Sequence, residues 1–143
     1  MFIDTQIIGD ATHLPTLKAA AIMANGTVLL QGYDSGQPST TNFYIGVRNI
    51  NLDTTSVTAS NTIFALNWAV SQGTNLINVN FHLAPDSNHV GIEMDGGSGG
   101  GGSGTFMGDL TFSGGMVGIL LNNQQYAMRN VTFTNVRPAL KGQ

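Results

Sequence analysis

The feature of this chain that most constrains its fold is an internal repeat of short alternating segments. Four segments begin with Asn or Asp and carry apolar residues at their second and fourth positions: residues 49–52 (NINL), 78–81 (NVNF), 109–112 (DLTF) and 130–133 (NVTF). Their first residues lie 29, 31 and 21 positions apart. Between them a second pattern recurs, in residues 91–95 (GIEMD) and 118–122 (GILLN). Two types of segment therefore recur in a fixed order.

This repeat predicts a solenoid, because a period of about 20 to 50 residues is typical of units that stack to bury a shared core. The units are strands, since they alternate apolar with polar residues and are bounded by Gly, Asn or Ser. Charged residues make up only 9% of the chain, which disfavours long surface helices. We predict an all-β fold, a right-handed parallel β-helix of about five or six coils.

Side chains alternate between the two faces of a strand, so the apolar residues of each repeat should point into the coil. The predicted core column contains Ile50, Leu52, Val79, Phe81, Leu110, Phe112, Val131 and Phe133. Unequal spacing is compatible with this stacking, because extra residues can loop out at a turn. Residues 14–22 (LPTLKAAAI) are interpreted as a strand, followed by a turn at Asn25 and Gly26.

Residues 1–143 are predicted to form a single, partial β-helix domain with a Gly/Ser loop at 96–104. The Gly/Ser run could instead be a linker, since such tracts behave as flexible coil. A loop is the simpler interpretation, because strand patterns of one register occur on both sides, at 92–95 and 106–112. Neither end shows the polar cap that solenoids need, so we expect the chain to be a piece of a longer array.

Charge and hydropathy restrict the partners. With five Lys or Arg and a net charge of −3, the chain has no basic stripe, so no nucleic-acid partner is expected. No stretch approaches the about 20 apolar residues of a membrane span, so no membrane contact is expected. Residues 1–10 have neither the basic start nor the apolar core of a signal peptide. Cysteine is absent, which leaves the redox compartment open.

Residues 114–133 carry the most specific resemblance to a known family. A Gly-rich turn at 114–118 precedes Asn-Gln-Gln-Tyr at 123–126 and Arg-Asn-Val-Thr-Phe at 129–133. This order resembles the β-1,3-glucanases of glycoside hydrolase family 55, whose fold is a pectin-lyase-like solenoid. Further similarity covers most of the chain, in residues 5–10 (TQIIGD), 44–53 (YIGVRNINLD), 89–97 and 106–112.

The resemblance implies a function for the longer protein. In that family two β-helix domains lie side by side, and the enzymes release glucose units from the end of a polysaccharide, β-1,3-glucan, with inversion. This chain resembles part of the first domain, so a second β-helix domain is the implied partner. The family's general acid is a carboxylate of that second domain, so the chain alone is expected to be inactive. The resemblance also implies an extracellular parent protein and no cofactor.

Glu93 and Asp95 are candidate site residues. Inverting hydrolysis needs two groups about 6.5 to 9.5 Å apart, one to protonate the leaving oxygen and one to activate water. Residues two apart on a strand share a face at about 6.5 to 7 Å between their Cα atoms. A solvated acidic outer face is the favoured interpretation, since any such pair satisfies this spacing. As site residues, both are assigned to substrate binding.

Gln124 and Gln125 are candidates because amides can hold a water or a sugar hydroxyl without titrating. Adjacent residues point to opposite faces, so one of the two would face the cleft. The family uses amide side chains of its first domain to hold the attacking water. This resemblance assigns that catalytic role to Gln125 and substrate binding to Gln124. The alternative is that both stabilise a turn.

Arg48 and Arg129 precede the Asn of equivalent repeats and are predicted to share one column. Three coils of about 4.8 Å separate them by roughly 14 Å, so they cannot clamp one carboxylate, and structural pairing with nearby Asp residues is expected. The following residues, Asn49, Asn78 and Asn130, predict a ladder of amides that bond from coil to coil.

His13, His82 and His89 lack the spacing of a metal site, so we predict surface histidines and no metal. Trp68 is predicted to pack in the core or at a corner, with stacking on a sugar ring as the alternative.

Two other functions stay open. A polysaccharide lyase would need a Ca²⁺ site of several acidic residues and a Lys or Arg base, and the spacing of the acids indicates no such cluster. A non-catalytic module for glycan binding or structure is compatible with the fold, because β-helices serve many functions.

Overall fold

The computed structural model describes residues 1–95, 104–122 and 125–142, so the predicted Gly/Ser loop at 96–104 lies outside them except for Gly104. This part of the chain contains two parallel sheets and one short 3₁₀ helix, η1 (Ser39–Thr41). Sheet A contains β1 (Gln6–Ile8), β2 (Thr16–Lys18), β4 (Gly46–Asp53), β6 (Asn75–His82), β8 (Thr105–Ser113) and β10 (Tyr126–Thr134). Sheet B contains β3 (Thr27–Gln31), β5 (Ile63–Asn67), β7 (Val90–Asp95), β9 (Val117–Asn122) and β11 (Leu140–Gly142).

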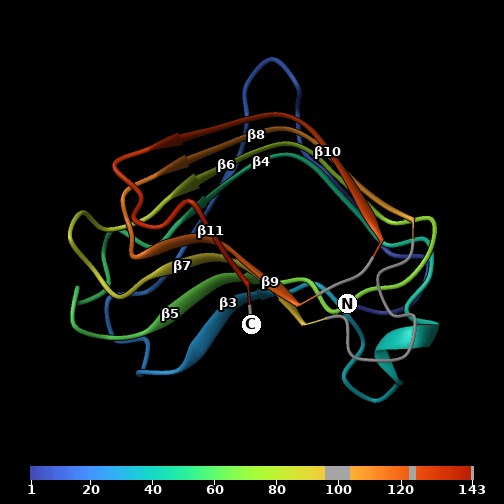
Figure 1. Cartoon of the computed structure of the whole chain (residues 1–143), viewed down its shortest axis with the longest axis horizontal. Coiled ribbons are helices and arrows are strands. Elements are labelled where there is room, and N and C mark those ends of the chain that lie inside the picture. Colours follow the sequence, from blue (N-terminus) through green and yellow to red (C-terminus); the bar gives the residue numbers. More distant parts are fainter. Residues whose placement is uncertain (96–103, 123–124, 143) are drawn as a thin grey trace.

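The chain alternates between the two sheets, and each strand pairs with the strand of its own sheet in the next coil. The order β4-β6-β8-β10 in sheet A runs beside β5-β7-β9-β11 in sheet B, as Figure 1 shows. The described residues complete five coils, so the predicted parallel β-helix is confirmed. Both strands that flank the Gly/Ser run, β7 and β8, belong to these sheets.

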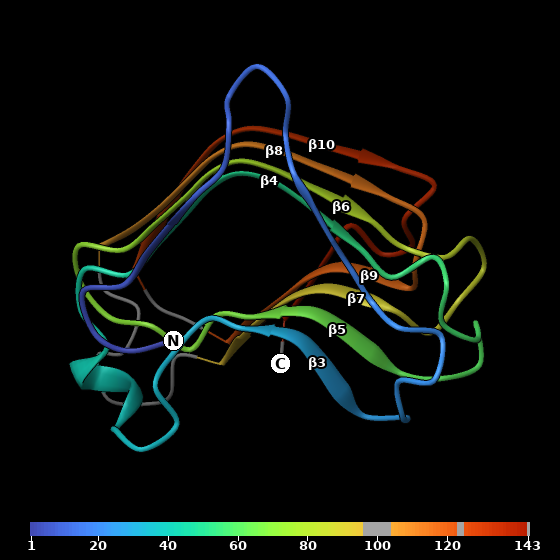
Figure 2. The same cartoon turned by 180° about the vertical axis from the view of Figure 1, so that it is seen from behind.

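The first coil carries a loop that stands out from sheet A. Strands β1 and β2 pair with opposite ends of β4, and residues 9–15 between them project beyond the sheet (Figure 2). Asn51 Nδ2 donates to the carbonyl of Leu14 at 3.3 Å, which attaches one side of the loop to β4. The strand predicted within 14–22 is β2, and the turn after it has Gly26 at a φ of 78°.

Each long strand of sheet A bends at the Asn or Asp that opens its repeat. That residue has a positive φ in every case, 56° at Asn49, 54° at Asn78, 55° at Asp109 and 54° at Asn130. In β4, Val47 and Ile50 are both buried although three positions separate them, so the bend breaks the simple alternation. Asn and Asp tolerate this left-handed conformation better than most residues with a side chain, which explains their place in the repeat.

The residues at the bend also form a ladder. Asn78 Nδ2 donates to Asn49 Oδ1 at 2.9 Å, and Asn130 Nδ2 donates to Asp109 Oδ1 at 2.7 Å. At the first coil, Asn49 Nδ2 donates to the carbonyl of Gly9 at 3.3 Å. The predicted ladder of amides is confirmed for Asn49 and Asn78, while Asn130 bonds to Asp109 as acceptor, and among the described residues no bond is found between the side chains of Asn78 and Asp109.

Arg48 and Arg129 share one column, as predicted. The register pairs Arg48 with Ile77, Ile77 with Gly108, and Gly108 with Arg129. The expected Asp partner is wrong for Arg48, because its Nε donates to Asn75 Oδ1 at 2.8 Å. Asn75 lies two positions before Ile77, so its side chain is on the same face of the neighbouring strand and within reach.

The core column is confirmed. Six of its eight predicted residues are buried, and Val131 and Phe133 pack against them partly buried on β10, the last sheet-A strand of the described chain. Rings stack along the axis, with centroids 4.5 Å apart for Phe81 and Phe112 and 4.9 Å apart for Phe112 and Phe133. A Cβ at Gly91 would lie 2.7 Å from the Phe112 ring, which explains why the second pattern begins with Gly.

His89 corrects the prediction of surface histidines, which holds for His13 and His82 only. The His89 side chain is fully buried, with Nδ1 2.8 Å from Thr54 Oγ1 and Nε2 3.3 Å from the carbonyl oxygen of Thr58. It directly precedes β7, where the chain turns inward, and neighbouring turns supply both polar partners. Burial lowers the pKa of His89, although the Thr58 carbonyl acts in the opposite direction.

Replacing Asn78 by Ala should lower the free energy of unfolding by about 2 kcal/mol, because Ala is strained at positive φ and the ladder bond is lost. Asn78→Gly should cost about 1 kcal/mol, since Gly accepts this conformation. Asn80→Ala is the control without a positive φ, and it removes two hydrogen bonds, one donated to Asn51 Oδ1 at 2.8 Å and one accepted from the Thr111 hydroxyl at 2.6 Å. Urea unfolding followed by circular dichroism measures all three. Equal losses for Ala and Gly at position 78 would contradict a conformational contribution.

The pKa of His89 predicts acid sensitivity. Because this pKa is lower in the folded chain than the ordinary 6.5, folding favours the neutral imidazole, and stability should fall as the pH drops below about 6.5. Thermal unfolding at about pH 7.5 and about pH 5.5 measures the difference. His89→Asn should lose part of this pH dependence, while His82→Asn, at an exposed position, should keep it. An unchanged pH dependence in His89→Asn would show that another group is responsible.

Candidate functional site

Three of the predicted site residues, Glu93, Asp95 and Gln125, lie toward one corner of the β-helix, where the chain leaves sheet B and turns toward sheet A. We call this the B-to-A corner, formed by residues 68–74, 93–95, 104–105, 122 and 125. Glu93 lies on β7, whose last residue is Asp95, and Gln125 directly precedes β10. The register pairs Asp95 with Asn122 at the end of β9, so these segments lie on neighbouring coils. Gln124 lies outside the described residues.

Glu93 is half-buried and held by a neighbouring strand. Asn67 Nδ2 of β5 donates to Glu93 Oε2 at 2.8 Å, which orients the carboxylate. The other atom of that amide, Asn67 Oδ1, is buried and has no hydrogen-bond partner within the described chain. An unpaired buried acceptor costs about 1 to 3 kcal/mol, so the hydrogen bond to Glu93 is made at some cost in stability. The assignment of Glu93 and Asp95 to substrate binding stays a prediction.

Gln125 is exposed at a fixed point of the backbone. Its carbonyl accepts from the amide of Gly104 at 3.0 Å, which joins the residue before β10 to the residue before β8. An exposed amide side chain at a defined position can orient a water molecule or a sugar hydroxyl. The water-positioning role of Gln125 stays a prediction, as does substrate binding by Gln124.

A buried polar contact supports the corner from beneath. Trp68 is fully buried, as predicted, and its Nε1 donates to Thr105 Oγ1 at 3.2 Å. Thr105 Oγ1 also bonds to Thr74 Oγ1 at 2.5 Å. Trp68 and Thr74 lie in the turn between β5 and β6, and Thr105 begins β8 in the next coil, so the contact joins two neighbouring turns of the corner. The indole is inaccessible, which rules out its stacking on a sugar ring.

Two carboxyl groups outside the corner are poorly suited to be the general acid. Burial tends to raise the pKa of Asp53, but hydrogen bonds from Thr55 and the Lys18 ammonium at 3.1 Å leave it below its ordinary value. Hydrogen bonds from the Thr12 hydroxyl and amide likewise lower the pKa of Asp10. A general acid needs a raised pKa, so neither group fits that role.

A metal site and a membrane-spanning helix each place requirements on the described ranges. Within residues 1–95, 104–122 and 125–142, no three His, Asp or Glu side chains come together as a metal site would require. A calcium-dependent lyase would need such a cluster. In the same residues, no helix has the length and apolar character to span a membrane.

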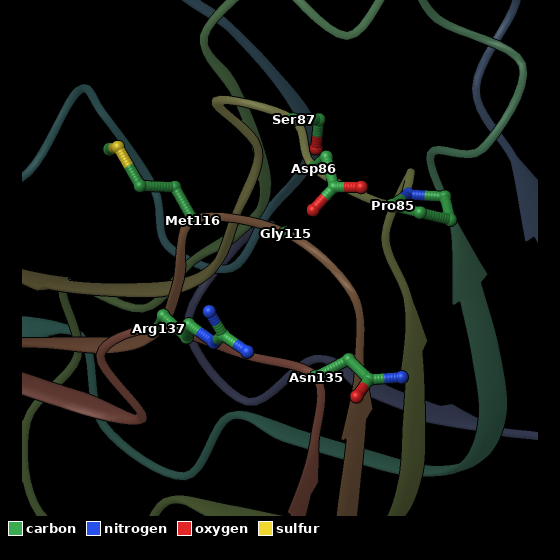
Figure 3. Close-up of a pocket in the computed structure, with 7 residues that line it drawn as sticks. All are labelled: Pro85, Asp86, Ser87, Gly115, Met116, Asn135 and Arg137. Atoms are coloured by element: carbon green, nitrogen blue, oxygen red, sulfur yellow. The ribbon is translucent and has the colours of Figure 1, made fainter.

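A pocket of about 340 Å³ lies at the opposite corner, where the chain passes from sheet A to sheet B (Figure 3). We call this the A-to-B corner, formed by residues 83–89, 114–116 and 135–139. The pocket is lined by Pro85, Asp86, Ser87, Gly115, Met116, Asn135 and Arg137. None of them was predicted to form a site. The repeat did indicate that residues of this corner lie side by side. Each stacked Phe is followed four positions later by a residue of the pocket: Pro85, Met116 and Arg137.

Comparison with known proteins places the chain in a family. The family described as "Rhamnogalacturonase A/epimerase, pectate lyase-like" matches residues 2–143. A probable glucan endo-1,3-beta-glucosidase of Arthroderma benhamiae is 37% identical over 145 residues, which cover 95% of this chain and 16% of that protein. A glucan 1,3-beta-glucosidase of Cochliobolus carbonum is 37% identical over 136 residues, covering 89% and 16%.

A third relative has a different kind of name. The non-secreted LysM effector LysM19 of Penicillium expansum is 35% identical over 147 residues, which cover 98% of this chain and 11% of the effector. The chain thus spans between 11% and 16% of the length of these relatives. The matches confirm the resemblance to family 55 glucanases. Together with the five parallel coils, they show that the chain belongs to the rhamnogalacturonase A/epimerase, pectate lyase-like family.

Proposed function

We propose that this chain is part of a glycoside hydrolase acting on β-1,3-glucan, in which it supplies scaffold and one wall of the substrate cleft. The observation that carries the proposal is its 37% identity, over at least 89% of the chain, to one protein named a probable glucan endo-1,3-beta-glucosidase and one named a glucan 1,3-beta-glucosidase. The B-to-A corner supports it. There β7, which carries Glu93, pairs with β9, after which the chain reaches Gln125, and the buried Trp68 bonds to Thr105.

The proposed reaction is exo-acting and inverting. Inversion needs a water molecule that attacks the anomeric carbon from the face opposite to the leaving oxygen. The Gln125 amide would accept a hydrogen bond from this water and orient it, while Glu93, and Asp95 beside it, would accept hydrogen bonds from sugar hydroxyls. An amide cannot donate a proton to the leaving oxygen. The general acid is therefore proposed to come from a second β-helix domain across the cleft.

A non-catalytic role is the second candidate. Two relatives that cover 98% of the chain are named as effectors and not as glucosidases, at 35% and 32% identity. A similar β-helix segment therefore occurs in proteins that are not named as glucosidases, and a glycan-binding or structural module fits the fold equally well. Extracellular location of the longer protein stays a proposal, since both of these relatives are named non-secreted.

The division of labour between two domains predicts a difference between the chain alone and a polypeptide that also carries the second domain. The 143 residues alone should release no glucose from laminarin, because the general acid is missing. The longer polypeptide should release glucose whose first-formed anomer is α, as ¹H NMR of the early reaction would show. Laminarin hydrolysis by the chain alone would contradict the missing acid, and β-glucose as first product would contradict inversion.

Gln125→Ala, made in the longer polypeptide, should lower kcat roughly 10- to 100-fold with a small change in KM, because the attacking water loses its orientation. Asn88→Ala is the control, since it removes an exposed amide at the A-to-B corner, where Asn88 Nδ2 donates to the Ser60 carbonyl at 3.0 Å. It should leave kcat unchanged. Steady-state release of glucose from laminarin measures both variants. A raised KM with unchanged kcat in Gln125→Ala would assign this residue to substrate binding instead.

A further inference from the structure

The pocket at the A-to-B corner is built by turns from three successive coils. In Figure 3 the turn that carries Asp86 and Ser87 lies on one side of the pocket, the turn that carries Asn135 and Arg137 lies on the other, and Gly115 and Met116 lie between. Its volume of about 340 Å³ is near the lower end of the range of small-molecule sites, about 300 to 1,000 Å³.

Hydrogen bonds within the turns and a glycine hold the backbone around the pocket. Gly115 has a φ of 78° and its amide donates to the Ala84 carbonyl at 3.0 Å. A Cβ at Gly115 would lie 2.5 Å from Leu83 Cδ1 and 2.9 Å from the carbonyl oxygen of His89, so this turn requires glycine. The buried Ser87 hydroxyl donates to Ala84 at 2.6 Å and accepts from the His89 amide at 3.2 Å. Ser87 therefore stabilises the turn, and ligand contacts fall to other residues.

The pocket presents two opposite charges that do not neutralise each other directly. Asp86 and Arg137 are exposed and line it from different coils. Among the ion pairs of the described chain, none involves either side chain. Asn135 adds an exposed amide, and Met116, with 39% of its surface exposed, adds an apolar wall. The pocket thus offers a hydrogen-bond acceptor in Asp86 and a donor in Arg137. Asn135 can donate and accept, and Met116 provides an apolar contact.

This combination selects the class of ligand. An anion would be attracted by Arg137 and repelled by Asp86. A cation would be attracted by Asp86 and repelled by Arg137. A neutral sugar has hydroxyl groups that donate to the carboxylate and accept from the guanidinium at the same time. The C–H face of its ring can pack on Met116 and Pro85. A neutral hexose therefore satisfies every group that faces the pocket.

We propose that the pocket at the A-to-B corner binds one neutral hexose unit of a polysaccharide, as a saccharide site separate from the cleft. The two corners lie at opposite ends of the sheet-A strands, which contain 8 or 9 residues in β4, β6, β8 and β10. At about 3.3 Å per residue this separation is on the order of 25 Å along the chain. The site would hold a polymer to the protein without taking part in its cleavage. That the polymer is β-1,3-glucan rests on the proposed function.

The test is an NMR titration of the ¹⁵N-labelled chain with laminaritriose, maltotriose, glycine and inorganic phosphate. Laminaritriose should shift the amide signals of Gly115 and Met116. Asp86→Asn and Arg137→Gln should each weaken binding by roughly tenfold or more, since each removes a charge-assisted hydrogen bond. Asn tolerates the φ of 49° at position 86. The matched controls Asp4→Asn, at a φ of 63°, and Arg129→Gln should bind as the unmodified chain does.

The outcomes are distinct. Thermal unfolding should be nearly the same in all four variants, because the ion pairs found within the described residues involve none of Asp4, Asp86, Arg129 and Arg137. Binding of glycine or phosphate without either sugar, no shift at Gly115 and Met116, or lowered stability of Asp86→Asn and Arg137→Gln with unchanged binding would each overturn the proposal. Equal binding of maltotriose and laminaritriose would support a hexose site while removing its link to β-1,3-glucan. Loss of laminarin hydrolysis by Gln125→Ala with intact binding here would separate the two sites.

Discussion

Coil-to-coil register is the constraint on which the rest of this structure depends. A parallel β-helix has no turn that fixes the alignment of neighbouring strands directly, because those strands are separated by a whole coil. Here side chains hold the alignment from both sides of the backbone. The amide ladder at Asn49 and Asn78 bonds at the bend, and the Phe81 and Phe112 rings stack inside at 4.5 Å. A slip by one residue would break the ladder and reverse the inward-facing residues together.

Once the register is fixed, the turns at the two corners are free to differ in sequence. The strands keep matched lengths of 8 or 9 residues in β4, β6, β8 and β10, while the segments between them vary in length and composition. Both the predicted cleft residues and the pocket belong to these segments or lie at strand ends. The polar groups there come from different coils, so each site depends on the stacking beneath it. The buried contact of Trp68 with Thr105 and the fixed turn at Gly115 are the local supports.

The sequence predicted the repetitive part of this architecture well and its irregular part poorly. Ile50 and Val79 were identifiable because a strand alternates faces with a period of two. The inward residue before the bend of each strand, such as Val47, was missed because the positive φ of Asn49 shifts the alternation by one. His89 was taken for a surface residue, since nothing in its neighbours indicates that the turn before β7 points inward. The pocket was missed because Asp86 and Arg137 meet only through stacking, which no short motif records.

The loop between β1 and β2 affects how this side of sheet A can pair with strands of other molecules. Residues 9–15 interrupt the outer row of sheet A, so that only the three-residue strands β1 and β2 flank β4. Pro15 lies in the interruption and cannot donate a main-chain hydrogen bond. A long, flat edge would offer a template for a strand of another molecule, whereas two short strands beside a protruding loop do not. Among the described strands, the loop therefore leaves no long, flat edge beside β4 for a strand of another molecule to pair with.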